Sequence, residues 1–236
     1  MKLLLSSNST LHGAPYLQFC KADINAFLAE NNVKNVLFIP FAAVTFSYDS
    51  YLENVKNGLD NKAINLTSIH QYDNKQQAVT EADAIMVGGG NSFKLLNEVY
   101  ENDIIERIQE VVKAGIPYIG WSAGSNLACP TIKTTNDMPI ICPPSFDGLH
   151  LISFQINPHY LHGKPPGHNG ETREERLTEF LEVNPNITVV GLREGTMLKI
   201  ENDQIHLIGD RTARIFKTNQ AFYELKSTDN FQFLLK

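Results

Sequence analysis

Residues 116–129 have the sequence IPYIGWSAGSNLAC, which is the stretch that most clearly indicates the fold. Ile116–Ile119 are apolar and predict a short buried strand, while Ser125–Cys129 can begin a helix. Between them, Gly120-Trp121-Ser122-Ala123-Gly124 has the pattern G-x-S-x-G. A strand, a tight turn and a helix in this order are typical of an α/β protein with a serine at the carboxyl edge of its sheet.

The chain upstream of this stretch alternates short apolar runs with amphipathic stretches, which predicts repeated β-α units. Strands are expected at Lys2–Ser6, Asn35–Pro40, Ile64–His70, Ala84–Gly88 and Pro117–Gly120. Helices are expected at Tyr16–Glu30, Tyr48–Leu59 and Ser92–Ala114, the last with a break near Asn102-Asp103. We therefore expect an α/β fold with a doubly wound, mostly parallel sheet flanked by helices on both faces.

The character of the sequence changes after Ser122. Residues 130–170 are rich in Pro, Asn, Gly and His and predict long irregular loops, which are usually binding or lid segments. A helix at Glu171–Val183 and a strand at Thr188–Leu192 are expected to follow. A C-terminal β-meander is predicted at Thr196–Glu201, Gln204–Ile208, Arg214–Lys217 and Phe222–Leu225, with a tight turn at Asn202-Asp203. Because no linker or repeat interrupts the chain, we expect residues 1–236 to form a single domain.

Composition narrows the class of protein and its partners. The chain is 42% hydrophobic and 19% charged, as is typical of a globular protein. Its net charge is −6 and no basic cluster exceeds a pair, so we expect neither nucleic acid nor membrane as a partner. Cys20, Cys129 and Cys142 form no C-x-x-C motif, and the chain begins with no signal pattern. We expect a cytoplasmic protein, either a monomer or a homodimer.

The G-x-S-x-G turn favours Ser122 as a nucleophile. Small neighbours allow a tight turn from which the serine oxygen projects, and the following helix directs backbone N–H groups and its positive dipole end toward a developing oxyanion. Two alternatives stay open at this point. Ser122 could be only the N-cap of the helix, and Ser125 is a competing serine nearby.

A second glycine-rich turn, Gly88-Gly89-Gly90-Asn91-Ser92, ends one predicted strand and opens a helix. We interpret it as an anion-accepting turn in which the Gly90 N–H joins that of Ala123 as an oxyanion donor. Asn91 is a candidate substrate-binding residue. A nucleotide phosphate site is the rival, but neither G-x-G-x-x-G nor G-x-x-x-x-G-K-S/T fits, and a plain tight turn is also compatible.

Several longer motifs resemble the peptidase E family of α-aspartyl dipeptidases. They are GWSAGSNLACPTIKTTNDMPI (Gly120–Ile140), VGGGNSF (Val87–Phe93), INPHY (Ile156–Tyr160), GHNGETREER (Gly167–Arg176) and LLLSSNST (Leu3–Thr10). The resemblance runs to about residue 195 and implies a doubly wound sheet related to class I glutamine amidotransferases. It implies no cofactor and no metal. A metal site at His159-x-x-His162, with His168 nearby, lacks a carboxylate at a familiar spacing.

The resemblance also assigns roles to particular residues. It implies that Ser122 is the nucleophile and His159 the general base. His159 follows the apolar run Leu151–Ile156 and can therefore project from the end of a strand. Asp137 and Glu194 are both candidates for the acidic member of the triad. We favour Glu194, because it follows a predicted strand, whereas Asp137 lies in a loop.

The implied reaction is hydrolysis of dipeptides with an N-terminal aspartate through an aspartyl-enzyme ester. Arg173 is the candidate for the aspartate carboxylate, and Glu171 is a possible partner for the substrate's α-amine or for Arg173. The expected partners are therefore small acidic peptides. Two alternatives are a cyanophycinase-like hydrolase of β-aspartyl peptides and a non-catalytic binder of acidic peptides. A glutaminase-like activity would require cysteine at position 122.

Overall fold

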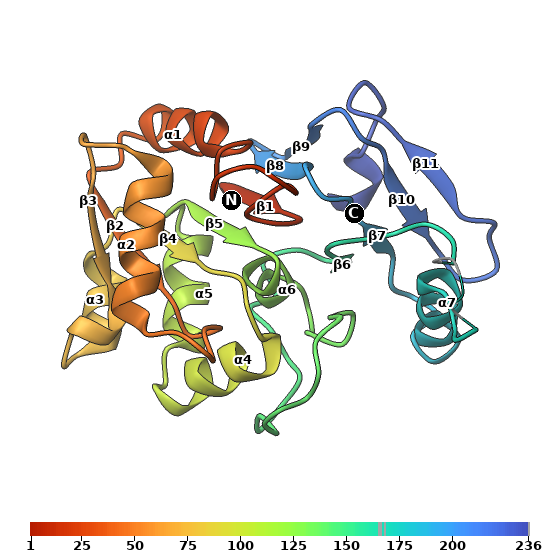
Figure 1. Ribbon diagram of the computed structural model, residues 1–236, viewed down its shortest axis with the longest axis horizontal. Coiled ribbons are helices and arrows are strands. Elements are labelled where there is room, and N and C mark those ends of the chain that lie inside the picture. Colours follow the sequence, from red (N-terminus) through yellow and green to blue (C-terminus); the bar gives the residue numbers. More distant parts are fainter. Residues whose placement is uncertain (165–166, 168, 236) are drawn as a thin grey trace.

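A seven-stranded sheet forms the centre of the computed structural model, which describes residues 1–164, 167 and 169–235 (Figure 1). The strand order is β3-β2-β4-β5-β1-β8-β9. The parallel strands are β1 (Leu3–Ser6), β2 (Asn35–Ile39), β3 (Asn65–Ser68), β4 (Ala84–Val87) and β5 (Tyr118–Trp121). An antiparallel hairpin, β8 (Met197–Glu201) and β9 (Gln204–Ile208), extends the sheet beyond β1. The expected mostly parallel α/β sheet is confirmed.

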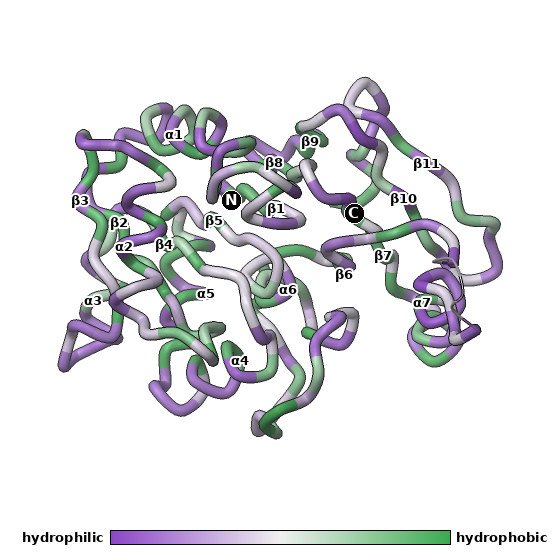
Figure 2. The backbone as a smooth tube through the Cα atoms, viewed as in Figure 1, coloured by the Kyte–Doolittle hydropathy of each residue, from purple (hydrophilic) through white to green (hydrophobic). Residues whose placement is uncertain are grey.

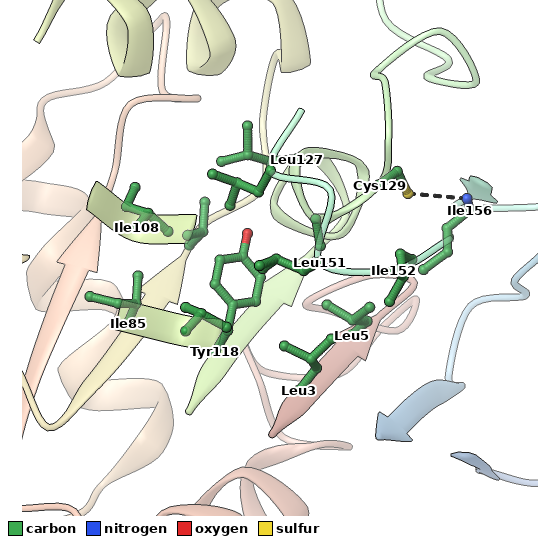
Figure 3. Close-up of a cluster of buried hydrophobic side chains, with 14 of the residues drawn as sticks. Leu3, Leu5, Ile85, Ile108, Tyr118, Leu127, Cys129, Leu151, Ile152 and Ile156 are labelled. Atoms are coloured by element: carbon green, nitrogen blue, oxygen red, sulfur yellow. Dashed lines mark hydrogen bonds between the residues drawn. The ribbon is translucent and has the colours of Figure 1, made fainter. Parts of the chain in front are cut away.

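Helices cover both faces of this sheet. One face carries α1 (Lys21–Glu30) and α2 (Tyr48–Leu59), and the other carries α3 (Lys75–Glu81), α4 (Ser92–Glu101), α5 (Ile105–Lys113) and α6 (Ala123–Ala128). Side chains alternate between the faces with the period of a strand: Leu3 and Leu5 pack in one core cluster and Leu4 in the other. Figure 3 shows the first of these clusters, in which Leu3, Leu5 and Tyr118 meet side chains from α5 and α6.

The helix boundaries differ from expectation in two places. The first helix begins at Lys21 rather than Tyr16, because Leu17 has a φ of 58° that an α-helix cannot accommodate. Helix α3 is only 7 residues long and was absent from the expected elements. The break near residue 102 is confirmed, since α4 ends there and Asp103 has a φ of 51°. β3 is followed at once by the 3₁₀ helix η1 (Ile69–Gln71).

A second, four-stranded sheet has the order β11-β10-β7-β6. Its strands are β6 (Gln155–Asn157), β7 (Val189–Gly191), β10 (Ala213–Phe216) and β11 (Tyr223–Leu225), and α7 (Arg173–Val183) packs beside it. The four predicted C-terminal strands and their antiparallel pairs, β8 with β9 and β10 with β11, are confirmed, but the two pairs lie in different sheets and so form no continuous meander. β8 and β9 join the central sheet, whereas β10 pairs with β7, because buried Ala213 and Ile215 of β10 belong to the same core as Val190. The turn at Asn202-Asp203 is confirmed, with φ values of 52° and 57°.

The chain between α6 and β6 is an irregular loop, as expected. Its tip is hydrophobic, which Figure 2 shows at the bottom of the view, and Met138 is 78% exposed. The loop is tied back to the body of the protein, because the Asn91 side chain donates to the Met138 carbonyl over 2.8 Å. In the residues described, no helix combines the length and the hydropathy needed to cross a membrane.

Candidate active site

Ser122 lies in the turn between β5 and α6, where its backbone has φ 53° and ψ −113°. A Cβ added to Gly120 would lie 2.5 Å from the Gly124 carbonyl oxygen, and one added to Gly124 would lie 2.3 Å from that of Val87. Only glycine therefore fits two positions before and two positions after the serine. A strained non-glycine backbone held by such packing is typical of a functional position.

The two alternatives for this turn can now be compared with the structure. The Ser122 side chain makes no capping hydrogen bond to α6, so it lacks the contact that defines an N-cap. Ser125 is fully buried, and its hydroxyl is 2.7 Å from the Ser6 carbonyl and 3.0 Å from that of Gly120. Its hydroxyl thus holds the turn against β1 and is inaccessible to a substrate.

His159 approaches Ser122 from the end of β6. Its Nε2 is 3.0 Å from the Ser122 Oγ, and its Nδ1 is 2.7 Å from a carboxylate oxygen of Glu194. The strand is fixed to α6 by the Ile156 N–H, which donates to the Cys129 Sγ over 3.2 Å (Figure 3). Because an ionised carboxylate only accepts hydrogen bonds, the neutral ring carries its proton on Nδ1 and leaves Nε2 to accept the serine proton.

Glu194 follows β7, and its loop is anchored by the neighbouring Arg193. Arg193 donates from Nη1 to the Thr212 carbonyl over 2.7 Å, and from both terminal nitrogens to Glu224 over 2.7 and 2.9 Å. Although partial burial raises it, hydrogen bonds from Arg193, Thr212 and Arg214 lower the pKa of Glu224 to about 2. The Glu224 carboxylate is therefore ionised at neutral pH, and its two hydrogen bonds from Arg193 fix the chain on one side of Glu194.

Asp137 does not contact the imidazole in the structure. One oxygen of its carboxylate accepts from the Ser92 N–H and the Ser92 hydroxyl, both over 2.7 Å, and from the Thr135 hydroxyl over 3.0 Å. These bonds attach the loop to the N-terminus of α4. Of the two carboxylates considered from the sequence, the structure therefore brings Glu194 to His159 and leaves Asp137 beside α4.

The end of β1 makes a hydrogen bond to each of the three segments that carry the serine, the imidazole and the carboxylate. The Ser122 N–H donates to the Ser6 carbonyl over 3.1 Å, the His159 N–H to the Ser7 Oγ over 2.9 Å, and the Gly195 N–H to the Asn8 Oδ1 over 2.9 Å. The Ser7 hydroxyl also donates to the Leu192 carbonyl over 2.8 Å. Three consecutive residues thus hold together loops that are far apart in the sequence.

Ser7→Ala is expected to lower both stability and turnover. Ser7 is fully buried, and without its hydroxyl the His159 N–H loses its acceptor, which costs about 1–3 kcal/mol in the free energy of unfolding. The Leu192 carbonyl keeps a donor, the Tyr160 N–H at 3.0 Å. We expect kcat to fall about tenfold with KM little changed, because His159 has a φ of 51° and loses its backbone anchor. Urea unfolding and steady-state kinetics measure the two effects.

A matched control for this substitution is Ser68→Ala. Ser68 is also fully buried, and its hydroxyl contacts His70 at 2.7 Å. It is the last residue of β3, the edge strand of the seven-stranded sheet. It should lose stability without losing kcat. A Ser7→Ala variant with kcat within twofold of the wild type would contradict the positioning role.

The candidate oxyanion donors are the backbone N–H groups of Gly90, which lines the pocket of Ser122, and of Ala123, which follows Ser122 in the chain. Gly90 has a φ of 135°, and a Cβ there would lie 2.3 Å from the Ala42 carbonyl oxygen, so only glycine fits. Ala123 is the first residue of α6, where an N–H has no partner inside the helix. Within the described chain, neither N–H has an acceptor among the side chains or loop carbonyls. Both are available for a developing oxyanion.

Ser122 and His159 line an open pocket of about 500 Å³. Its other lining residues are Ser9, Tyr16, Phe46, Tyr51, Asn54, Gly89, Gly90 and Asp137. Burial raises the pKa values of Tyr16 and Tyr51, so both phenols stay protonated at neutral pH and can donate hydrogen bonds. Tyr51 donates to the Gly89 carbonyl over 2.9 Å, whereas the buried Tyr16 hydroxyl has no hydrogen-bond partner among the residues that the structure describes.

The residues from Ser9 to Asn54 were not identified from the sequence. They belong to the loop after β1 and to α2 with the loop before it. Ser9 lies in the motif LLLSSNST but was given no role there, and the other four residues lie outside the motifs. The aromatic residues of α2 follow an amphipathic pattern and are therefore expected in a core rather than in a pocket.

The three expected substrate-binding residues lie outside the lining of this pocket. Asn91 caps α4, where its side chain accepts from the Lys94 N–H over 3.0 Å. Glu171 lies 3.7 Å from Arg176 rather than beside Arg173. Arg173 begins α7 and is half-buried, and burial together with Arg176 lowers the pKa of its guanidinium. No acidic group makes an ion pair with Arg173 within the described residues.

The sequence led us to expect no metal at the histidine-rich segment that contains His159, His162 and His168. Among the residues that the structure describes, no three His, Cys, Asp or Glu side chains are grouped as metal ligands. His162 contacts Glu174 at 2.7 Å and Arg214 at 2.7 Å, and His168 lies outside the described residues.

The fold and the site place this chain among α/β proteins that carry a serine, an imidazole and a carboxylate in series at the carboxyl edge of a mostly parallel sheet. The order of these three contacts is the same as in a hydrolase triad. The model of peptidase family S51 matches residues 3–208, and the chain belongs to this family of peptidases.

Relatives with similar sequences are named as peptidases too. The chain is 50% identical over 235 residues to Peptidase E of Nostoc sp., an alignment that covers 100% of this chain and 97% of the relative. It is 50% identical over 217 residues to Peptidase E of Shewanella amazonensis, covering 92% of each chain. The crystal structure of a peptidase from an acI-B1 Actinobacterium has the same fold, with a TM-score of 0.67, 16% identity and coverage of 98% and 96%.

Proposed function

We propose that this peptidase is a serine dipeptidase that hydrolyses dipeptides with an N-terminal aspartate. Ser122 attacks the carbonyl carbon that follows the aspartate, and His159 Nε2 takes the serine proton. The same proton passes to the leaving amine as the C–N bond breaks, which leaves an aspartyl ester on Ser122. Water, deprotonated by His159, then attacks the ester and releases aspartate and the free serine.

The observation that carries this proposal is the continuous chain from Ser122 through His159 to Glu194, with contacts of 3.0 and 2.7 Å. The His159 side chain is 41% exposed, so a small substrate can reach it. Glu194 holds the ring in the tautomer that accepts a proton and stabilises the imidazolium formed during the attack. The Gly90 and Ala123 N–H groups supply the oxyanion donors.

The proposed preference for aspartate depends on Arg173. A half-buried guanidinium whose pKa is lowered by burial is stabilised by any anion placed against it. A planar fork can bind a carboxylate through two parallel hydrogen bonds, which favours the side chain of aspartate over that of asparagine or alanine. The name Peptidase E, carried by the relatives, supports the peptidase activity on which this preference depends.

Two measurements test the activity. Kinetics on a panel of X-Leu dipeptides should give the highest kcat/KM for Asp-Leu, and a fluorophosphonate probe should label Ser122. A protein that binds Asp-Leu but neither hydrolyses it nor takes up the probe would be a non-catalytic binder. Faster cleavage of β-aspartyl-arginine than of Asp-Leu would indicate a cyanophycinase-like hydrolase instead.

Arg173→Met is expected to lower kcat/KM for Asp-Leu about 10²-fold and to leave that for Ala-Leu within threefold, because only the aspartate carboxylate loses its partner. The ratio of the two kcat/KM values measures the preference. Arg176→Met is the matched control, since this exposed residue lies one turn further along α7 and faces Glu171. An unchanged ratio in Arg173→Met would show that the carboxylate binds elsewhere.

We also propose a cytoplasmic location. Cys20, Cys129 and Cys142 are free thiols, and the first two are buried. Burial raises the pKa values of Cys20 and Cys129 to about 12, so both are unreactive core residues rather than halves of a disulfide. Carbamidomethylation of the native protein, with and without reductant, should modify the same single cysteine, Cys142.

A further inference from the structure

We infer that Asp137 binds the free α-ammonium group of the substrate and thereby restricts the enzyme to unblocked N-termini. The inference rests on the proposed dipeptidase activity and deepens it. It gives Asp137 a binding role in place of the orienting role that the structure gives to Glu194.

The first support is the place of this carboxylate. Asp137 lines the same pocket as Ser122 and His159, and it is the single Asp or Glu among the lining residues of that pocket. The lining includes no Lys or Arg. Among the described residues that line the pocket, an ammonium ion placed beside Ser122 therefore meets one carboxylate and no Lys or Arg side chain.

The second support is how Asp137 is held. Its Oδ2 accepts all three hydrogen bonds, from the N–H and hydroxyl of Ser92 and from the Thr135 hydroxyl. Its Oδ1 has no hydrogen-bond partner within the described chain and is free to accept one from a ligand. The N-terminus of α4, which is 10 residues long, further stabilises a carboxylate at this position. The charge is thus fixed in place before any substrate binds.

The third support is the position of Asp137 relative to the oxyanion donor Gly90. Asp137 is bonded to Ser92, two residues after the oxyanion donor Gly90. In a substrate with an N-terminal aspartate, the α-nitrogen lies about 2.5 Å from the scissile carbonyl carbon, since only Cα separates them. A group that binds this nitrogen must lie next to the oxyanion site. Asp137 satisfies that requirement, whereas Glu171 faces Arg176 on α7 and does not line the pocket.

The substrate pair for the test differs only in the ammonium group. Asp-Leu carries it, and succinyl-Leu is the same molecule with hydrogen in its place. The wild type should prefer Asp-Leu about 10–100-fold in kcat/KM, because a hydrogen bond between two charged groups is lost in succinyl-Leu. Asp137→Asn keeps an oxygen for Ser92 but removes the charge. It should lower kcat/KM for Asp-Leu about 10–100-fold and leave that for succinyl-Leu within threefold, so that the preference falls to nearly one.

Asp147→Asn is the matched control. Asp147 is exposed on the same loop and lies outside the pocket, so both substrates should keep their wild-type kinetics. A fall by the same factor for both substrates in Asp137→Asn would overturn the inference, because a residue that acts on His159 or on folding affects both alike. Absence of Asp-Leu hydrolysis by the wild type itself would instead reject the proposed function.

A binding measurement keeps the inference testable if Asp137→Asn has no measurable activity. In the Ser122→Ala background, calorimetry should show that Asp137→Asn weakens Asp-Leu binding about 10–100-fold and leaves succinyl-Leu binding unchanged. In the single Ser122→Ala variant, Asp-Leu binding should weaken above about pH 8, where a peptide α-amino group loses its proton, and succinyl-Leu binding should not. Equal weakening for both ligands in the double variant would overturn the inference.

Discussion

Ser122→Ala is expected to reduce kcat on Asp-Leu by about 10⁴–10⁶, the loss that commonly follows removal of a nucleophile. The substitution deletes the only atom that can form the aspartyl ester and leaves His159, Glu194 and the oxyanion donors in place. KM or Kd for Asp-Leu should change little, because the Ser122 Oγ contributes to bond formation rather than to binding. Single-turnover and steady-state kinetics on Asp-Leu measure the effect.

The control for this variant is Ser153→Ala. Ser153 also donates a side-chain hydrogen bond, to the Leu234 carbonyl over 2.9 Å, but far from the pocket. It should retain the wild-type kcat. Circular dichroism and thermal unfolding should show that Ser122→Ala is folded, since alanine has the same Cβ that serine already places in this backbone conformation, with φ 53°. A decrease in kcat of less than tenfold would reject Ser122 as the nucleophile.

Glu194→Gln is expected to give the second largest loss, about 10³–10⁴ in kcat. Glutamine has nearly the same shape but can donate a hydrogen bond to His159 Nδ1, which favours the tautomer with its proton on Nε2. That tautomer cannot accept the Ser122 proton, and the imidazolium also loses its negative partner. The same kinetics on Asp-Leu, with the folded state verified by thermal unfolding, measure the loss.

Glu201→Gln on β8 is the control, because Glu201 pairs with Lys199 at 3.6 Å at the sheet edge and should be neutral for kcat. The comparison with Asp137→Asn separates the two carboxylates. The loss in Glu194→Gln should be the same factor for Asp-Leu and for succinyl-Leu, whereas the loss in Asp137→Asn should be confined to Asp-Leu. The reverse pattern would exchange the two roles.

The central sheet could be predicted from the sequence because its signals are local. Leu3 to Leu5, and likewise Val36 to Ile39, are continuous apolar runs, as strands buried on both faces require, and amphipathic helices follow them. The C-terminal strands have equally clear local patterns, but nothing local states which sheet each of them joins. β10 pairs with β7, whose residues lie 23 to 27 positions upstream of their partners, through a contact that depends on the packed core. That dependence explains why the predicted strands form no continuous meander.

The site was predictable to a similar extent. Ser122 stands in a motif whose glycines are required by direct backbone contact, and the structure brings His159 and Glu194 to it. Asp137 and Glu194 could not be separated from the sequence by more than a preference for a strand end. Tyr16, Phe46 and Tyr51 carry no motif, because an aromatic side chain in a pocket and one in a core have the same local pattern.

The sequence by itself determined the elements that are read from neighbouring residues: the parallel strands, the serine turn between β5 and α6, and the family motifs. The tertiary structure decided which carboxylate faces His159 and which residues surround Ser122. The physical reason is that these contacts join segments separated by 35 and 37 positions, held together by the end of β1 through single hydrogen bonds. Single hydrogen bonds between distant segments leave no periodic pattern in the sequence. They can therefore be identified only in the folded structure.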